Sequence, residues 1–431
     1  MKNPNKKYVY SALAVLLVLI AVILAIPSGK GENRKNASIK GINAVLTNEM
    51  SDCEDLAKME KDLRIFMQRW QIRGLELAVM RNDSLLYSKG FGWADQEKEE
   101  AMRPGTIMRV ASVSKLVTAA GIMKLAEDGR LRLTDKVFGP GGILKDTVYT
   151  NHIKDKGYYD ITVEQLLRHE GGLTIRRGDP MFRTRDLMNI YHLDEVPDQN
   201  TLTSIAVRKR LDYTPGKSHE YSNFGYLLLS MVIEQKTGKG YEEWMQQNVL
   251  EPAGCQDFHL AYNSYEERHP GESRYHMQDN DPKVPKYDNS ADSVARCYGG
   301  NDIRALKGAG AWVCSAPELA RFVASIDGKP GVPDILSRKS VQEMTAYSKD
   351  HKFSLGWNST DPKKGWLRTG SLSGTSAYLM NFPDGECWIL LSNTHAWKGP
   401  RFSRTVHNFI QQCRLRYSIK MPSRDLFTSI Q

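Results

Sequence analysis

This chain of 431 residues lacks the short motifs that mark several common classes of hydrolase. It has no G-x-S-x-G turn of an α/β-hydrolase and no H-x-H pair of a zinc β-lactamase. His169-Glu170 does not continue into the H-E-x-x-H of a zinc protease, because Leu173 occupies the last position. These absences leave three hydrolase classes without support, and we expect neither a metal site nor a cofactor.

The spacing of the cysteines and of the basic residues also indicates no metal site and no binding surface for nucleic acid. The six cysteines form no C-x-x-C pair and no zinc spacing, so we expect isolated thiols. Cys297 and Cys314 are the first pair to examine if the compartment is oxidising. The net charge is +9, but no dense basic run follows the lysines and arginines of the first 35 residues. Nucleic acid is therefore not an expected partner.

The longest apolar run of the chain lies near the N-terminus. Residues 8–26 carry no charge and follow Lys2, Lys6 and Lys7. At about 1.5 Å per residue, this run is long enough to cross the roughly 30 Å hydrocarbon core of a membrane. We expect residues 1–27 to form a cytoplasmic stub and an uncleaved signal anchor, and residues 28–60 to form a tether. The alternative is a cleaved signal peptide followed by secretion.

The most informative stretch of the chain is a predicted helix start at residues 110–116. Ser112 and Lys115 are three positions apart, so their side chains lie on one face of a helix. Residues 116–126 are nearly all apolar, which predicts that this helix is buried. A serine hydroxyl needs a base nearby, and a lysine whose pKa is lowered by burial can be that base. The two residues are therefore a candidate catalytic pair.

Predicted strands lie near both ends of the chain and enclose a mostly helical middle. Residues 53–70 have helical periodicity, and a predicted hairpin follows. Near the other end, three predicted strands precede a helix at residues 401–413. The strands expected from the residue pattern are 75–80, 85–91, 365–369, 376–382 and 387–391.

This order of elements predicts an α/β (α+β) fold with a transmembrane helix at its N-terminus. We expect an antiparallel sheet built from both chain ends and flanked by helices. A mostly helical subdomain is inserted at about residues 136–305. The globular domain is expected over residues 61–418, and a tail over residues 419–431.

Three motifs, in chain order, resemble those of the penicillin-recognising serine hydrolases. They are Ser112-x-x-Lys115, Tyr221-Ser222-Asn223 after Pro215-Gly216, and Arg368-Thr369-Gly370 before Ser371. The resemblance is to the class C β-lactamase branch, which also contains D-Ala-D-Ala carboxypeptidases and esterases. It covers the chain from about residue 75 to the last helix, which is most of the expected globular domain.

Other matches to the same motifs are interpreted as structural. Tyr149 and Tyr287 fit Y-x-N, but neither follows Pro-Gly or opens an apolar helix. Lys236-Thr237-Gly238 is a literal K-T-G, yet it lies at the end of a predicted helix, where Thr-Gly is ordinary capping. The arginine version at residues 368–370 is therefore taken as the third motif.

The resemblance implies a role for each catalytic residue. Ser112 would attack an acyl carbon and form an acyl-enzyme. Lys115 and Tyr221 would take its proton and return it to the leaving group, because an ammonium holds a phenol closer to ionisation. Backbone N–H groups of Ser112 and Ser371 would form the oxyanion hole.

The resemblance also implies substrate contacts for Asn223, Arg368, Thr369 and Gly370. Arg368 departs from the lysine or histidine that the family usually carries. It keeps a cation that we expect to bind a substrate carboxylate, but it cannot carry a proton. Two structural interpretations without a role in catalysis stay open. Asn223 would then be a helix cap, and Arg368 would be a solvated charge at a strand edge.

We expect an exported serine hydrolase that acts through an acyl-serine on a small amide or ester. A β-lactam, a D-amino-acid peptide and a small ester all fit these residues, which do not choose among them. One alternative is an acyltransferase that passes the acyl group to an alcohol or amine. Another is a non-catalytic penicillin-binding receptor. The expected location is the bacterial cell envelope, with the anchor in the inner membrane and the catalytic domain outside it; the residues predict no particular protein partner.

Overall fold

The computed structural model describes residues 40–173, 175, 178–290 and 293–430. The expected signal anchor at residues 1–27 lies outside the described residues. Among the helices that are described, none combines the length and the apolar character that a membrane span requires.

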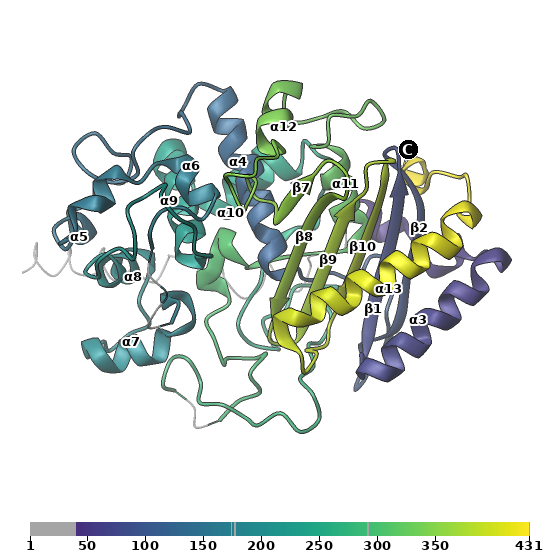
Figure 1. Cartoon of the computed structure of the whole chain (residues 1–431). Helices are drawn as coiled ribbons and strands as arrows, with labels where there is room; N and C mark the ends of the chain where they lie inside the picture. The colour runs from purple at the N-terminus through teal and green to yellow at the C-terminus, as the bar shows by residue number, and fades with distance from the viewer. Residues whose placement is uncertain (1–39, 174, 176–177, 291–292, 431) are drawn as a thin grey trace, which may run out of the picture. The chain divides into compact units, whose positions relative to one another are not determined.

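An antiparallel sheet organises the described part of the chain, with seven strands in the order β3-β2-β1-β10-β9-β8-β7 (Figure 1). Strand β1 pairs with β10, so that Leu77 lies opposite Leu390, and the two ends of the chain meet inside one sheet. The expectation of an antiparallel sheet built from both ends is confirmed. The strands are β1 (Gly74–Arg81), β2 (Ser84–Asp95), β3 (Glu100–Ala101), β7 (Ser359–Asp361), β8 (Gly365–Leu372), β9 (Thr375–Asn381) and β10 (Glu386–Ser392).

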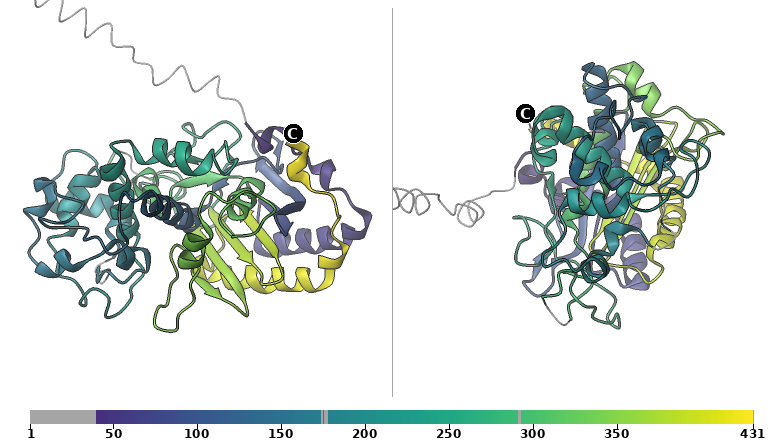
Figure 2. Two further views of the ribbon diagram at one scale, coloured as in Figure 1. Left: turned by 90° about the horizontal axis from the view of Figure 1, so that it is seen from above. Right: turned by 90° about the vertical axis from the view of Figure 1, so that its left-hand side faces the viewer.

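Helices cover both faces of this sheet (Figures 1 and 2). On one face, α3 (Ala57–Trp70) and α13 (Phe402–Tyr417) pack through Phe66 and Phe409, whose rings lie 4.2 Å apart between centroids. On the other face, α11 (Ala316–Ala324) packs against β1 and β10. Strands β9 and β10 are therefore buried along their whole length, which explains the apolar runs at their centres, residues 377–380 and 387–391.

The helical part of the domain is built around α4 (Ser114–Glu127) and α9 (Asn223–Thr237), which pack against each other. Helix α9 ends at Gly238, whose φ of 72° is the left-handed conformation of a helix cap. Lys236-Thr237-Gly238 therefore has the capping geometry expected from the sequence. The other helices are α2 (Ile42–Val45), α5 (Thr147–Thr150), α6 (Val163–Leu167), α7 (Thr184–Tyr191), α8 (Gln199–Ala206), α10 (Tyr241–Met245) and α12 (Arg338–Met344).

A second sheet is built from three short strands that lie far apart in the chain. It consists of β4 (Met108–Arg109), β6 (Trp312–Cys314) and β5 (His259–Leu260), in that order across the sheet. Strand β4 ends just before Ser112, so this small sheet fixes the approach of the chain to the α4 helix.

Folded structure extends past the domain boundaries expected at residues 61 and 418. Ile42 is only 1% exposed, and the Asn43 side chain donates to Asp257 at 3.2 Å. At the other end, Leu426 is 1% exposed and Asp425 accepts from the N–H of Leu85. Much of the expected tether and tail is thus packed onto the domain, because both segments carry apolar side chains that it buries.

All six cysteines lie among the described residues as free thiols. Cys297 and Cys314 are both buried, and each is unbridged in the structure.

Candidate active site

Ser112 lies in a single 3-10 turn, Ala111–Val113, that leads directly into α4. The residue before it, Ala111, has a φ of 49°, a conformation that is uncommon for residues other than glycine. The turn is held from both sides, because the N–H of Val110 donates to the Trp312 carbonyl oxygen and the N–H of Trp312 donates to Ser114 Oγ. An unfavourable backbone conformation of this kind persists only where the surrounding structure enforces it. Here the enforced turn places Ser112 at the start of the buried helix α4.

Lys115 is fully buried, and its ammonium group lies next to the hydroxyl group of Ser112. Its Nζ donates to Ser112 Oγ at 3.4 Å, to Asn223 Oδ1 at 2.7 Å and to the Ala309 carbonyl oxygen at 2.5 Å. Burial lowers the pKa of this lysine, Tyr221 acts in the opposite direction, and the charge of Arg368 lowers it further. Three acceptors thus surround the three protons of the ammonium and fix its position beside the serine.

Tyr221 lies against the same lysine, with Lys115 Nζ 4.8 Å from the centre of its ring. Burial opposes ionisation of the phenol, but the charges of Lys115 and Arg368 and hydrogen bonds with Lys115 and Ser112 outweigh it. Together they lower the pKa of Tyr221 to about 8. A phenol with this pKa is suited to accept a proton near neutral pH.

The ring of His169 packs against the ring of Tyr221. The two rings lie 4.3 Å apart between centroids, and His169 Nδ1 accepts a hydrogen bond from the N–H of Ser222 at 3.2 Å. Burial, followed by the charges of Lys115 and Arg368, lowers the pKa of His169 well below its usual value. This neutral imidazole therefore holds the second motif in place.

Arg368 points inward from β8, toward groups of the protein itself. Its Nε and Nη2 atoms donate to the backbone carbonyl oxygen of Ser112 at 2.8 and 2.6 Å, and Nη2 also lies 3.3 Å from the Tyr221 hydroxyl. The side chain is 1% exposed, so it is not the solvated strand-edge charge that the sequence left open. The guanidinium reaches the Ser112 carbonyl oxygen because β8 closely approaches the Ser112 turn. The expected contact with a substrate carboxylate stays a prediction.

Gly370 makes that close approach possible. A Cβ atom at this position would lie 2.3 Å from the Val110 carbonyl oxygen and 3.0 Å from the Ser112 nitrogen. Beyond Leu367, β7 no longer pairs with β8, and the N–H of Thr369 donates to the side chain of Asn358 at 2.9 Å. Peptide N–H groups alternate along a strand, so the N–H of Ser371 points to the same edge. This arrangement suits the predicted oxyanion hole of Ser112 and Ser371.

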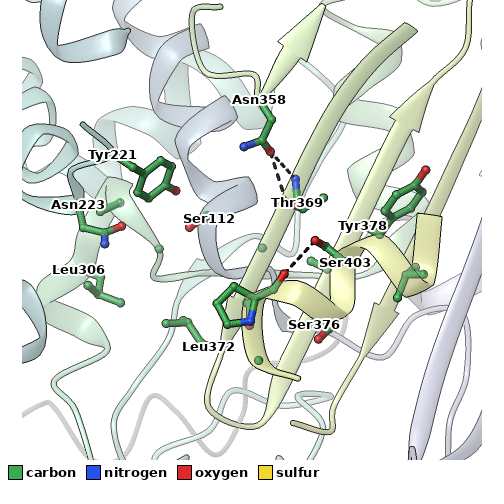
Figure 3. A pocket seen from close by; sticks show the side chains of 18 of the residues that line it. Ser112, Tyr221, Asn223, Leu306, Asn358, Thr369, Leu372, Ser376, Tyr378 and Ser403 are labelled. Atoms are coloured by element: carbon green, nitrogen blue, oxygen red, sulfur yellow. Dashed lines mark hydrogen bonds between the residues drawn. The ribbon is translucent and has the colours of Figure 1, made fainter. Parts of the chain in front are cut away.

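A cavity of about 350 Å³ opens at Ser112 and continues along β8 toward the start of α13 (Figure 3). Ser112, Tyr221 and Asn223 line one end, and uncharged side chains line the rest. The other lining residues are Phe182, Leu306, Ala309, Gly310, Asn358, Thr369, Gly370, Ser371, Leu372, Ser376, Ala377, Tyr378, Leu390, Gly399, Pro400, Ser403 and Val406.

The structure brings the three sequence motifs together and leaves the other motif matches elsewhere. Tyr149 is buried in α5, and the Tyr287 hydroxyl accepts from Asn263. Two residues at the site were missed by the sequence analysis. Asn358 lines the cavity, and Asp179 accepts from the backbone and the side chain of Asn223, both at 3.0 Å. Neither residue belongs to a recognisable motif.

The fold and the three motifs around one cavity are those expected of the penicillin-recognising serine hydrolase superfamily. A model of the Beta-lactamase family matches residues 59–410. The chain belongs to this family.

Known relatives are similar over part of their length. Protein flp of Staphylococcus aureus (strain MW2) is 26% identical over 227 residues, which is 51% of this chain and 41% of that protein. Penicillin-binding protein 4* of Bacillus subtilis (strain 168) is 27% identical over 190 residues, 44% of this chain and 38% of that protein. The matched regions thus span less than half of these relatives.

Solved structures share the fold. D-amino acid amidase from Ochrobactrum anthropi SV3, in complex with L-phenylalanine amide, aligns with a TM-score of 0.61 and 19% identity. The alignment covers 85% of this chain and 99% of that one.

Proposed function

We propose that this protein is a serine hydrolase that forms an acyl-enzyme on Ser112 with an amide or ester substrate. The observation that carries the proposal is the grouping of the Ser112 hydroxyl with Lys115 Nζ and the Tyr221 phenol at the end of the cavity. Activation of a serine requires a base within hydrogen-bond reach, and the lowered pKa of Tyr221 gives it that capacity.

In the proposed reaction, Ser112 Oγ attacks the acyl carbon while its proton passes to the Tyr221 oxygen, with Lys115 holding the phenol close to ionisation. The N–H groups of Ser112 and Ser371 stabilise the negative oxygen that develops on the acyl carbon, an effect of about 3 kcal/mol per donor in other enzymes. The proton then passes to the departing amine or alcohol. Water repeats the same steps to release the acid and regenerate Ser112.

Arg368 has a supporting role in this proposal. It neutralises part of the charge on an ionised Tyr221 and anchors the backbone carbonyl of Ser112. Substrate contacts are assigned to the groups that line the cavity, which are Asn223, Asn358 and the edge of β8 at Thr369 and Gly370 that does not pair with β7. An extended acyl substrate could lie along that edge as an additional strand.

A substrate panel tests the proposal. The purified domain is assayed with a chromogenic cephalosporin, a D-alanyl peptide, a D-amino acid amide and a short p-nitrophenyl ester, with the Ser112→Ala variant beside it. We expect turnover of at least one substrate that is lost in the variant. Faster product formation with an added alcohol would assign the acyltransferase alternative, and a stable acyl-enzyme without turnover would assign the receptor alternative. No reaction of Ser112 with any of them would contradict the proposal.

The proposed location is the cell envelope, with the domain exported and tethered through residues 8–26. The support is the uncharged apolar run itself. The full-length protein is expected in the membrane fraction, and a chain starting at residue 37 in the soluble fraction. Recovery of the full-length chain in the soluble fraction, with its N-terminus intact, would contradict the anchor.

A further inference from the structure

Asp179 lies beside the active site and accepts three hydrogen bonds, two of them from the second motif. Its Oδ2 atom accepts from the backbone N–H and from the side-chain Nδ2 of Asn223, both at 3.0 Å. Its Oδ1 atom accepts from the N–H of Met181 at 3.0 Å and caps the short turn that follows. The carboxylate thus joins the loop before Pro180 to the first residue of α9.

These contacts determine which end of the Asn223 side chain faces Lys115. An ionised carboxylate only accepts hydrogen bonds, so it selects the NH₂ end of the amide. The amide oxygen is then turned toward Lys115, whose Nζ donates to it at 2.7 Å. With the amide reversed, two donors would face each other at Lys115, and one acceptor of the ammonium would be lost.

We propose that Asp179 is a positioning residue for catalysis, which fixes the Asn223 amide with its oxygen on Lys115 and adds a negative charge behind that contact. The proposal rests on the proposed function, since it concerns the same lysine and tyrosine. It assigns a role to a residue that touches neither Ser112 nor the cavity.

The charges around the pair explain why the carboxylate matters. The groups that face Lys115 and Tyr221 are Arg368 of β8, the neutral His169, Tyr226 of α9 and Asp179. Burial lowers the pKa of Lys115, and Asp179 is one of the groups that act against this effect. Asp179 is the carboxylate among these facing groups, and its negative charge favours the charged form of Lys115.

The test uses Asp179→Asn, which keeps the shape of the side chain and removes its charge. Without the negative charge, deprotonation of the Lys115–Tyr221 pair becomes easier. The ascending limb of the pH profile of kcat/KM should therefore move to lower pH, by roughly half a unit, since the carboxylate acts through one intervening residue. The value of kcat should fall about tenfold, because the amide of Asn223 is no longer held in one orientation.

Asp186→Asn is the matched control. It removes the same charge from an exposed carboxylate seven positions along the chain, which pairs with Arg183 at 3.0 Å and has no contact with Asn223. Its pH profile should match the wild type. Asp179→Ser provides a second variant in which the cap of the following turn is kept, since serine is a good capping residue, while the charge is again lost.

A reciprocal exchange separates positioning from simple structural support. In Asp179→Asn combined with Asn223→Asp, an amide again faces a carboxylate, and a carboxylate oxygen faces Lys115. Activity should rise above that of Asn223→Asp alone. An unchanged pH limb in both Asp179→Asn and Asp179→Ser, or a loss of activity without recovery in the exchange, would overturn the proposal. Reaction of Ser112 with a fluorophosphonate in the wild type shows separately whether the proposed function itself holds.

Discussion

The guanidinium of Arg368 holds the backbone carbonyl oxygen of Ser112 with two N–H groups, at 2.8 and 2.6 Å. The two residues are 256 positions apart, yet the contact ties the third motif to the nucleophile itself. A pair of charge-assisted hydrogen bonds to one carbonyl is a strong restraint. We therefore expect Arg368 to act first on the geometry of Ser112 and on the ionisation of Tyr221, and to affect substrates through these.

The first prediction concerns this arginine. Arg368→Ala should lower kcat/KM for substrates with and without a carboxylate by the same factor, about tenfold or more at pH 7, because loss of the adjacent cation raises the pKa of Tyr221. Arg368→Lys should recover part of the loss. Arg304→Ala, which removes a charge that pairs with Glu242 away from the cavity, is the control. A defect confined to substrates with a carboxylate would instead support the direct contact between Arg368 and the substrate that the sequence predicts.

A second prediction treats Lys115 and Tyr221 as one unit. Lys115→Ala and Tyr221→Phe should each slow acylation by roughly 10²–10⁴-fold, as for other groups in proton transfer. The double variant should be little slower than either single variant, because the phenol depends on the charge of the lysine. Single-turnover rates measure this directly. Losses that multiply would mean that the two residues act independently.

Gly370 provides the third prediction. In Gly370→Ala the new methyl group would lie 2.3 Å from a backbone oxygen, so β8 must move away from Ser112 and carry the N–H of Ser371 with it. We expect kcat to fall by about 10²-fold, as when an oxyanion donor is lost. In the control, Gly141→Ala, nothing lies within 4 Å of the new atom. Full activity of a folded Gly370→Ala enzyme would count against the oxyanion hole placed at this edge.

The fourth prediction concerns stability. Burial is the main reason that the pKa of Glu318 rises to about 8, from an ordinary value of 4.5. Between these two pH values the folded protein keeps a proton that the unfolded chain has released. The free energy of unfolding should therefore fall as pH rises through this window, by up to about 1.4 kcal/mol per unit.

Urea unfolding at pH 5, 6, 7 and 8 measures this dependence. Glu318→Gln, which cannot ionise, should show a smaller fall with pH than the wild type. Glu343→Gln, on the exposed side of α12, should keep the wild-type slope. Equal slopes in all three proteins would show that Glu318 does not hold the proton in the folded state.

The sequence was sufficient for the main elements of the fold. The β1–β2 hairpin followed from two apolar runs around Asn82-Asp83, and both turn residues have the positive φ, 46° and 65°, that a tight hairpin needs. Strands β3, β4, β5 and β7 could not be predicted, because two or three residues are too few for a periodic pattern. Strands β4 and β5 in addition pair with β6, which lies far from both in the chain.

The residues of the candidate site that belong to a motif could be predicted from the sequence. The positions that depend on contacts between distant parts of the chain could not. The order of the motifs along the chain was enough to predict that Ser112, Lys115 and Tyr221 lie together. The direction of Arg368 depends on how closely β8 approaches the Ser112 turn, which no local pattern records. Asp179 and Asn358 contribute through hydrogen bonds to motif residues, and an isolated Asp or Asn in a loop gives no signal of such contacts.

The central claim is that Ser112 is the nucleophile, and covalent labelling tests it most directly. The purified domain is treated with a fluorophosphonate, digested and analysed by mass spectrometry, beside Ser112→Ala and Lys115→Ala. The account predicts one adduct on the peptide that contains Ser112, none in Ser112→Ala, and much slower labelling in Lys115→Ala. An adduct on another serine, with Ser112 unmodified in a folded protein, would contradict it.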